Sequence, residues 1–212
     1  MPFDSTICNS PVMDLIRRTK QMPARLAVFP GTYNPPTQAH LALAEAALQA
    51  TEEVLFVLPR TFPHKPYSGA SMEQRLDLLL QATSEQPLFS IGTSEGGLFI
   101  DIARECREHY PAGTELLFLC GRDAAERVVT WDYGDPQALP LMLNEFRLLV
   151  ARRGSEYEPP PDVAERVVPL ILELDWDEVS ATTVRDRIAA GADWQHLVPS
   201  SIVAKVQAIY GR

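Results

Sequence analysis

Short apolar runs alternate with amphipathic segments along most of the chain. Apolar runs bounded by turn-forming residues are typical of buried strands, and apolar residues spaced three or four apart are typical of helices. Strands are predicted at residues 26–29, 54–58, 88–91, 115–120, 146–151 and 167–172. Helices are predicted behind Thr37 and at residues 71–82, 100–110, 123–129, 139–143, 180–190 and 199–210. This alternation predicts an α/β fold with a doubly wound, mainly parallel sheet.

The predicted domain covers residues 23–212, and residues 1–22 are interpreted as an N-terminal extension. A short helix is expected at residues 12–21, ending before Pro23. Pro169 lies inside the last predicted strand, so that strand is expected at a sheet edge or at a bulge. The acidic, proline-rich residues 155–162 are expected to form a surface loop, because strands and helices resume after them.

Composition narrows the classes of function. Hydrophobic residues make up 46% of the 212 residues, enough for a sizeable core, and the formal net charge is -9. That charge argues against nucleic-acid and anionic-membrane partners, which bind basic faces. The three cysteines form no CxxC pair, and no signal peptide or run of about 20 apolar residues is found. A soluble cytoplasmic protein is expected, and a homo-oligomer stays open.

The candidate chemistry follows the predicted strands. Polar or glycine-rich segments come directly after four of them, at residues 31–40, 64–65, 121–123 and 180–185. In an open parallel sheet, ligands bind beyond the carboxyl ends of the strands. These segments are therefore expected to meet at one edge of the sheet.

Thr37 and His40 open the first predicted helix. Free backbone N–H groups at a helix start attract phosphate, and side chains three residues apart share a face. A threonine hydroxyl and an imidazole placed there can both donate to a phosphate oxygen. Taken alone, the pair is more often a simple cap with a packed histidine.

Ser180, Thr182, Thr183 and Arg185 open a later helix in the same way. Hydroxyls cap the helix and donate, and the arginine adds a forked positive charge. A capped surface helix with a solvated arginine explains the same residues equally well. Lys65 lies in a proline-flanked loop and could neutralise phosphate charge.

Trp131 stands eight residues after Asp123 and could stack on a flat heterocycle or fill the core. No His, Cys, Asp and Glu group has the spacing of a metal site, and neither a Walker lysine motif nor GxGxxG is present.

Together these motifs resemble the nucleotidylyltransferase superfamily, most of all bacterial nicotinate (or nicotinamide) mononucleotide adenylyltransferases. The resemblance runs from about residue 26 to the C-terminus. Its motifs are the opening Gly31-Thr32-Tyr33-Asn34-Pro35-Pro36-Thr37-Gln38-Ala39-His40, the loop Pro63-His64-Lys65, Arg75-Leu76, Gly121 and Asp123 with Trp131, Ser180 with Thr182 and Arg185, and Leu197-Val198-Pro199.

The resemblance implies transfer of the adenylyl group of ATP to a pyridine mononucleotide, with release of pyrophosphate and with Mg²⁺ carried by the phosphates. It implies that His40 and Thr37 act at the α-phosphate, and that Lys65 and Arg185 hold the β- and γ-phosphates. The remaining contacts would be made by Gly31, Thr32, Tyr33 and Asn34 on the adenosine side, by Ser180, Thr182 and Thr183 on the phosphates, and by Gly121, Asp123 and Trp131 on the acceptor.

Three positions depart from this family pattern. Thr37 stands where a histidine is usual, and Ala39 replaces a glycine. Around residues 97–101, where polar residues usually help to hold the pyridine substituent, Leu98, Phe99 and Ile102 are apolar. Threonine is tolerated at the first position in the related phosphopantetheine adenylyltransferases. Two alternatives therefore stay open: a different phosphorylated acceptor such as phosphopantetheine, and a nucleotide-binding protein without turnover.

Overall fold

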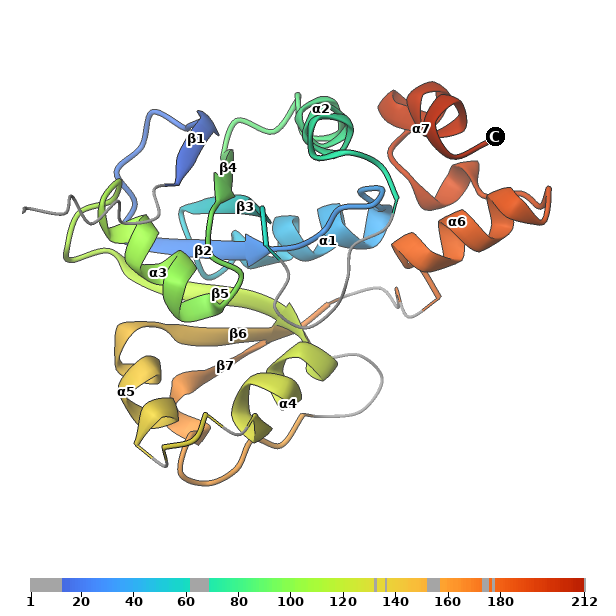
Figure 1. The fold of residues 1–212 in the computed structure, drawn as a ribbon. Coiled ribbons are helices and arrows are strands. Elements are labelled where there is room, and N and C mark those ends of the chain that lie inside the picture. Colours follow the sequence, from blue (N-terminus) through green and yellow to red (C-terminus); the bar gives the residue numbers. More distant parts are fainter. Residues whose placement is uncertain are drawn as a thin grey trace, which may run out of the picture.

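The computed structural model describes residues 13–61, 69–131, 133–135, 137–151, 157–172, 176 and 178–211. Seven strands form one sheet in the order β1-β4-β3-β2-β5-β6-β7 (Figure 1). Every neighbouring pair is parallel except β1 with β4. The strands are β1 (Asp14–Arg17), β2 (Arg25–Pro30), β3 (Glu53–Pro59), β4 (Phe89–Ser94), β5 (Glu115–Gly121), β6 (Arg147–Ala151) and β7 (Val167–Leu170).

Seven α-helices are found in the described part of the chain. They are α1 (Gln38–Ala47), α2 (Met72–Ala82), α3 (Phe99–Arg107), α4 (Arg122–Thr130), α5 (Ala138–Glu145), α6 (Ala181–Ala189) and α7 (Val203–Tyr210). Short 3₁₀ turns lie at η1 (Ala164–Arg166), η2 (Gln195–Leu197) and η3 (Ser200–Ile202). The predicted doubly wound α/β fold is confirmed, and the predicted edge position of the strand that holds Pro169 is also confirmed.

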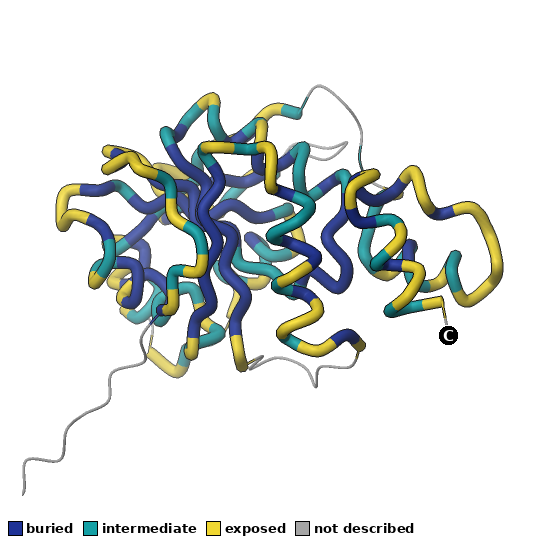
Figure 2. The backbone as a smooth tube through the Cα atoms, turned by 90° about the horizontal axis from the view of Figure 1, so that it is seen from above, coloured by how far each residue is buried: buried dark blue, intermediate teal, exposed yellow. Residues whose placement is uncertain are grey.

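The sheet is buried on both faces because its strands carry continuous apolar runs (Figure 2). Successive residues of a strand point to opposite faces. Leu26 and Val28 pack with α3, α4 and α5 in one core cluster, whereas Ala27 and Phe29 pack with α1 and α2 in a second cluster. The two-layer core explains why these strands could be recognised from the sequence.

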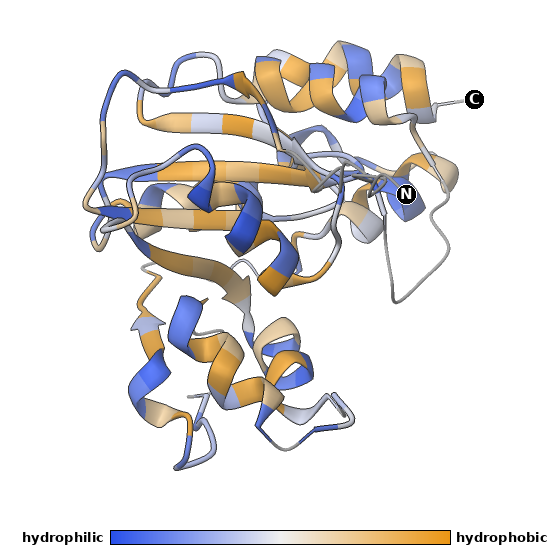
Figure 3. Ribbon diagram, turned by 60° about the vertical axis from the view of Figure 1, so that its left-hand side comes forward, coloured by the Kyte–Doolittle hydropathy of each residue, from blue (hydrophilic) through white to orange (hydrophobic). Residues whose placement is uncertain are grey.

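A third apolar cluster lies at the C-terminal end of the chain. The cluster contains Val184 of α6, Val206 of α7 and Leu78 of α2. Trp194 and Ile202, from the segment between α6 and α7, complete it. Figure 3 shows apolar stripes on the helices and along the strands of the sheet. The C-terminal helices therefore pack beside α2 on a small core of their own, at the edge of the main domain.

The helix expected at residues 12–21 is wrong. Residues 14–17 form β1, which pairs antiparallel with β4 through Asp14 and Thr93, Leu15 and Gly92, and Arg17 and Ile91. A Cβ atom at Gly92 would lie 3.2 Å from the carbonyl oxygen of Asp14, so the missing side chain lets β1 approach. Pairing with a distant edge strand decided the structure over local helical spacing. The boundary at residue 22 stays a prediction.

A buried carboxylate at the start of β3 bonds to the segment that follows β1 and to the segment that follows α3. Glu53, at the start of β3, is fully buried and accepts hydrogen bonds of 2.6 Å from the hydroxyls of Thr19 and Tyr110. Burial, followed by this bond to Glu53, raises the pKa of Tyr110 above its ordinary value.

None of the helices in the described ranges is both long and apolar enough to cross a membrane.

Replacing this carboxylate should destabilise the protein. We expect Glu53→Ala to lower the free energy of unfolding by about 2–3 kcal/mol, because two hydrogen bonds to a charged group are lost inside the protein. The matched control is Glu52→Ala, which removes two exposed contacts with Arg25, at 3.4 Å to its guanidinium and at 2.6 Å to its backbone N–H, and should cost less than about 1 kcal/mol. Urea denaturation measures both variants, and equal losses would contradict a special role for Glu53.

Candidate functional site

The order of the strands reverses between β2 and β5, where one crossover runs toward β3 and the other toward β6. Ligands of doubly wound sheets bind at this point, beyond the carboxyl ends of the strands. The loop of residues 31–37 follows β2, and Gly121 ends β5 beside it. Two of the predicted segments thus start from adjacent strands. His64 and Lys65 lie outside the described residues.

Tyr33 sets the shape of the loop after β2. Its φ of 46° lies in the left-handed region, its side chain is fully buried, and its hydroxyl donates to the carbonyl oxygen of Phe29. Burial holds its pKa well above the ordinary value. A Cβ atom at Gly31 would lie 2.8 Å from the Tyr33 ring, so the glycine makes room for that ring. The side chain of Tyr33, predicted to line the adenosine, faces the core.

Thr37 and His40 hold each other at the start of α1. The Thr37 hydroxyl accepts from the backbone N–H of His40 at 3.4 Å and lies 2.8 Å from Nδ1 of the ring. The backbone N–H of Thr37 also lies 3.0 Å from Nδ1. Because a backbone N–H can only donate, Nδ1 accepts, and a neutral ring carries its hydrogen on Nε2. Thr37 is fully buried, so its hydroxyl serves the helix start and His40.

Asn34 connects the loop to three other segments of the chain. Its side-chain oxygen accepts from the backbone N–H of Ala70 at 3.3 Å and from the Tyr210 hydroxyl at 2.6 Å. Its carbonyl oxygen accepts from Arg185 of α6. A Cβ atom at Gly69, whose φ is 129°, would lie 2.4 Å from the Asn34 amide nitrogen. Asn34 therefore has a structural role in addition to any contact with a ligand.

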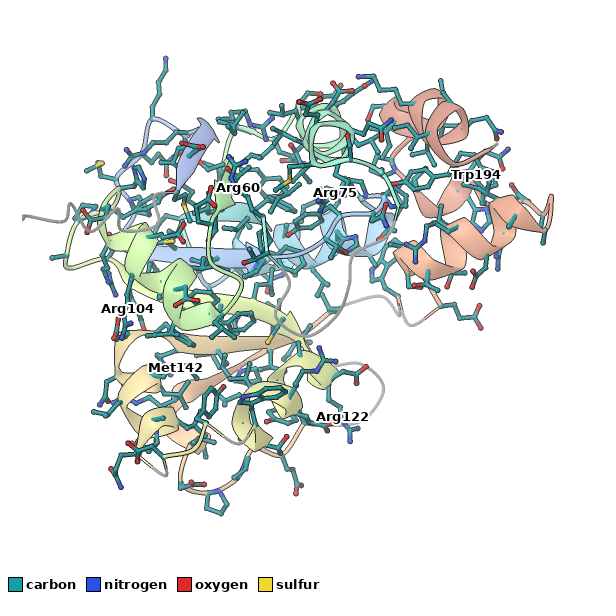
Figure 4. The ribbon with its side chains drawn as sticks, in the orientation of Figure 1. Arg60, Arg75, Arg104, Arg122, Met142 and Trp194 are labelled. Carbon is teal, nitrogen blue, oxygen red and sulfur yellow. The ribbon has the colours of Figure 1, made fainter. Side chains whose placement is uncertain are left out.

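Two arginines hold the loop by its carbonyl oxygens. Arg185 donates to Asn34 and Ala181, and its second nitrogen lies 3.2 Å from the Thr182 hydroxyl. Arg75 of α2 is 3% exposed and donates to the carbonyl oxygen of Thr32 at 2.8 Å (Figure 4). Arg75 is among the motif residues that carry the family resemblance, but the sequence did not predict its contact with the loop. A charged residue among the leucines of an amphipathic helix was the available signal.

The start of α6 is capped as the sequence suggested. The Ser180 hydroxyl accepts from the backbone N–H of Thr183 at 3.0 Å and lies 2.8 Å from the Thr183 hydroxyl. Thr182 is exposed next to Arg185. Since Arg185 reaches Asn34, the structure brings the predicted segments 31–40 and 180–185 together.

Trp131 borders a pocket of about 110 Å³. The pocket is on the face of the sheet that α3, α4 and α5 cover. The pocket lies between the start of α3, one face of α4 and Met142 of α5 (Figure 4). Its lining is mostly apolar: Gly97, Leu98, Phe99, Ile100, Ala124, Arg127, Val128, Trp131, Tyr133 and Met142. Trp131 is 48% exposed, so it does not fill the core. Engineered apolar cavities of roughly this size accept a benzene ring.

Gly121 and Asp123 lie at the opposite end of α4 from Trp131. Gly121 is the N-cap of α4 and makes no side-chain cap, and a Cβ atom there would meet nothing within 4 Å. Asp123 is exposed in the first turn and is not among the residues that line the pocket. The starts of α1 and α4, each with free backbone N–H groups, follow adjacent strands and can receive anionic groups.

Comparisons with known proteins agree with this geometry. A family model described as cytidylyltransferase-like matches residues 28–187. A Gloeobacter violaceus protein named "probable nicotinate-nucleotide adenylyltransferase" is 30% identical over 199 residues, which are 87% of this chain and 94% of that protein. A Thermus thermophilus protein of the same name is 30% identical over 191 residues, covering 86% of this chain and 96% of that protein.

The fold also matches solved structures. Plasmodium falciparum nicotinic acid mononucleotide adenylyltransferase complexed with NaAD superposes with a TM-score of 0.67 at 15% identity. The match covers 88% of this chain and 95% of that chain. At this level of identity the likeness shows a shared fold.

The contacts of His40 predict which of its nitrogens carries the hydrogen. We expect the neutral ring to be the Nε2–H tautomer, because the Thr37 backbone N–H donates to Nδ1. Long-range ¹H–¹⁵N correlation spectra above the titration of the ring measure this directly, and Thr37→Val should keep the tautomer. A neutral ring protonated on Nδ1 would contradict the arrangement. His109 serves as a reference resonance.

Proposed function

The chain belongs to the cytidylyltransferase-like family, and from this premise we propose that it transfers the adenylyl group of ATP to nicotinate mononucleotide. The products would be the dinucleotide and pyrophosphate, a step of NAD biosynthesis. The observation that carries the proposal is the ring-sized apolar pocket beside Trp131. Its helix α4 follows β5, which is the neighbour of β2, and β2 leads through its loop to His40 at the start of α1. The relatives' names support nicotinate as the acceptor base.

The reaction needs positioning more than covalent help from the protein. An oxygen of the acceptor 5′-phosphate attacks the α-phosphorus of ATP, and the bond from that phosphorus to the bridging oxygen breaks as pyrophosphate leaves. We assign His40 to stabilise the charge on the α-phosphate through Nε2–H. Thr37, whose hydroxyl lies 2.8 Å from Nδ1, orients the ring.

The start of α6 is assigned to the β- and γ-phosphates. Ser180 and Thr183 fix the first turn, whose backbone N–H groups attract anions, and Thr182 and Arg185 add a hydroxyl and a positive charge. Lys65 stays a proposed phosphate ligand. Within the described ranges, no three or more His, Cys, Asp or Glu side chains gather as a metal site. We propose that Mg²⁺ is bound by the phosphates.

We assign the two substrates to the two neighbouring strands at which the strand order reverses, one beyond β2 and the other beyond β5. We assign the adenosine to the loop after β2, where the backbone of Gly31, Thr32, Tyr33 and Asn34 would line it. We assign the acceptor to α4, with Gly121 and Asp123 near the ribose phosphate and the Trp131 ring against the pyridine. We further propose that the protein acts in the cytoplasm.

One observation favours a different acceptor. The start of α3 brings only apolar side chains to the pocket, from Leu98, Phe99 and Ile100. The thiol end of an acceptor such as phosphopantetheine would bind there without needing a polar partner, whereas the two amide groups of its arm would need hydrogen-bond partners outside this segment. This candidate shares the proposed catalytic groups and differs only in what the pocket binds.

Pyrophosphate release with ATP and a panel of acceptors tests the proposal. We expect turnover with nicotinate mononucleotide and little with phosphopantetheine, because the pocket matches one aromatic ring. Turnover with phosphopantetheine alone would overturn the proposed acceptor. ATP binding without turnover on any acceptor would instead identify a nucleotide-binding protein.

Two histidine variants serve as the matched controls of that assay. His40→Ala should lower kcat by about 100-fold or more while the protein stays folded, as expected for a group that stabilises transition-state charge. His109→Ala should keep turnover, because His109 bonds to the Met13 carbonyl oxygen near β1, away from the site. Equal activity of both variants would remove His40 from the mechanism.

A further inference from the structure

Among the described residues that line the pocket beside Trp131, one side chain is charged. Arg127 and Val128 stand three and four residues after Ala124, so these three residues share one face of α4. Trp131 follows the last residue of the helix, and all four residues line the pocket. The other side chains of the lining that the structure describes are uncharged. The hydroxyl of Tyr133 already donates to the Val128 carbonyl oxygen at 2.9 Å. A polar group entering the pocket therefore meets the guanidinium of Arg127 as its charged partner.

Arg127 is available for such a contact. It is exposed, and it makes no hydrogen bond or ion pair with any residue in the part of the chain that the structure describes. The neighbouring carboxylate of Glu126 is already paired with Arg122, four residues earlier in the helix, at 2.6 Å. By contrast, Arg75 and Arg185 are occupied by carbonyl oxygens of the loop after β2.

We propose that Arg127 is a specificity-determining residue that selects an acceptor base bearing a carboxylate over one bearing a carboxamide. A guanidinium offers several donors and no acceptor, so both oxygens of a carboxylate can pair with it. A carboxamide has one oxygen, and its NH₂ group would face the guanidinium without an acceptor. This inference rests on the proposed function and adds the group that reads the pyridine substituent.

The distribution of polarity around the pocket supports this assignment. Phe99, Val128 and Met142 offer a pyridine ring an apolar surface but no acceptor for an amide. Side chains that would discriminate an amide, such as Asp, Asn or Gln, are missing from the described lining. Selection by charge is then the discrimination that this set of side chains can provide.

The experiment compares nicotinate mononucleotide with nicotinamide mononucleotide in the wild type and in Arg127→Gln. We expect kcat/KM for the nicotinate form to fall by about 10- to 100-fold, the effect of losing hydrogen bonds between charged groups. The value for the nicotinamide form should change by less than about threefold. Arg127→Lys keeps the positive charge but not the forked guanidinium. Its kcat/KM for the nicotinate form should lie between the values of the wild type and of Arg127→Gln. Calorimetric binding of both mononucleotides gives a second readout.

Arg104→Gln is the charge-matched control. Arg104 lies on α3, pairs with Glu145 at 3.4 Å and does not line the pocket, so its removal should leave the preference unchanged. A wild-type preference that survives in Arg127→Gln would overturn this inference alone. Equal losses for both acceptors would also overturn it. Wild-type protein that neither binds nor adenylylates either mononucleotide would overturn the proposed function, and this inference with it.

Discussion

The arrangement of the site depends on how Asn34 is held. Its carbonyl oxygen accepts from Arg185 of α6, 151 positions away in the sequence. Its side-chain oxygen accepts from Tyr210 of α7, 176 positions away, and from Ala70, which precedes the N-cap residue of α2. These bonds join the loop after β2 to the C-terminal helices, which otherwise pack on their own apolar cluster. Because the side chain is short and 4% exposed, the bonds leave the loop few alternative positions.

Fixing this loop also fixes the start of α1. The loop ends at Thr37, whose backbone and hydroxyl orient His40, and Arg75 holds its other end at Thr32. The polar side of the site is thus built from backbone carbonyl groups, arginines and helix starts, beyond β2. The apolar side lies beyond β5, where α3, α4 and α5 leave a ring-sized pocket. A phosphate-transfer site with an aromatic acceptor needs this division.

Much of the fold could be predicted because burial leaves a direct trace in the sequence. The strands that hold Leu26, Val54 and Leu116 are buried on both faces and appear as continuous apolar runs. Thr37 and Ser180 were recognisable as helix caps, since a cap depends on residues only three positions apart. β1 was missed because a four-residue edge strand depends on Gly92 and β4, far away in the sequence.

The chemistry was harder to predict than the fold. The bond from Arg185 to Asn34 brings two of the predicted segments together, as their places after the strands indicated, but the burial of Tyr33 against Gly31 was not predicted. Arg127 belongs to none of the sequence motifs. Its place in the pocket is seen only in the structure, where residues at the start of α3 line the same pocket. Sequence spacing shows which face of a helix a residue occupies, whereas the partner of that face depends on tertiary packing.

The most direct test of this account is a crystal structure with nicotinate mononucleotide and a non-hydrolysable ATP analogue bound together. We expect the pyridine ring against Trp131 and the α-phosphate within hydrogen-bonding distance of His40 Nε2. We also expect the triphosphate along the start of α6. A pyridine ring bound away from the pocket, or an α-phosphate out of reach of His40, would contradict the assignment of this edge of the sheet as the site of adenylyl transfer.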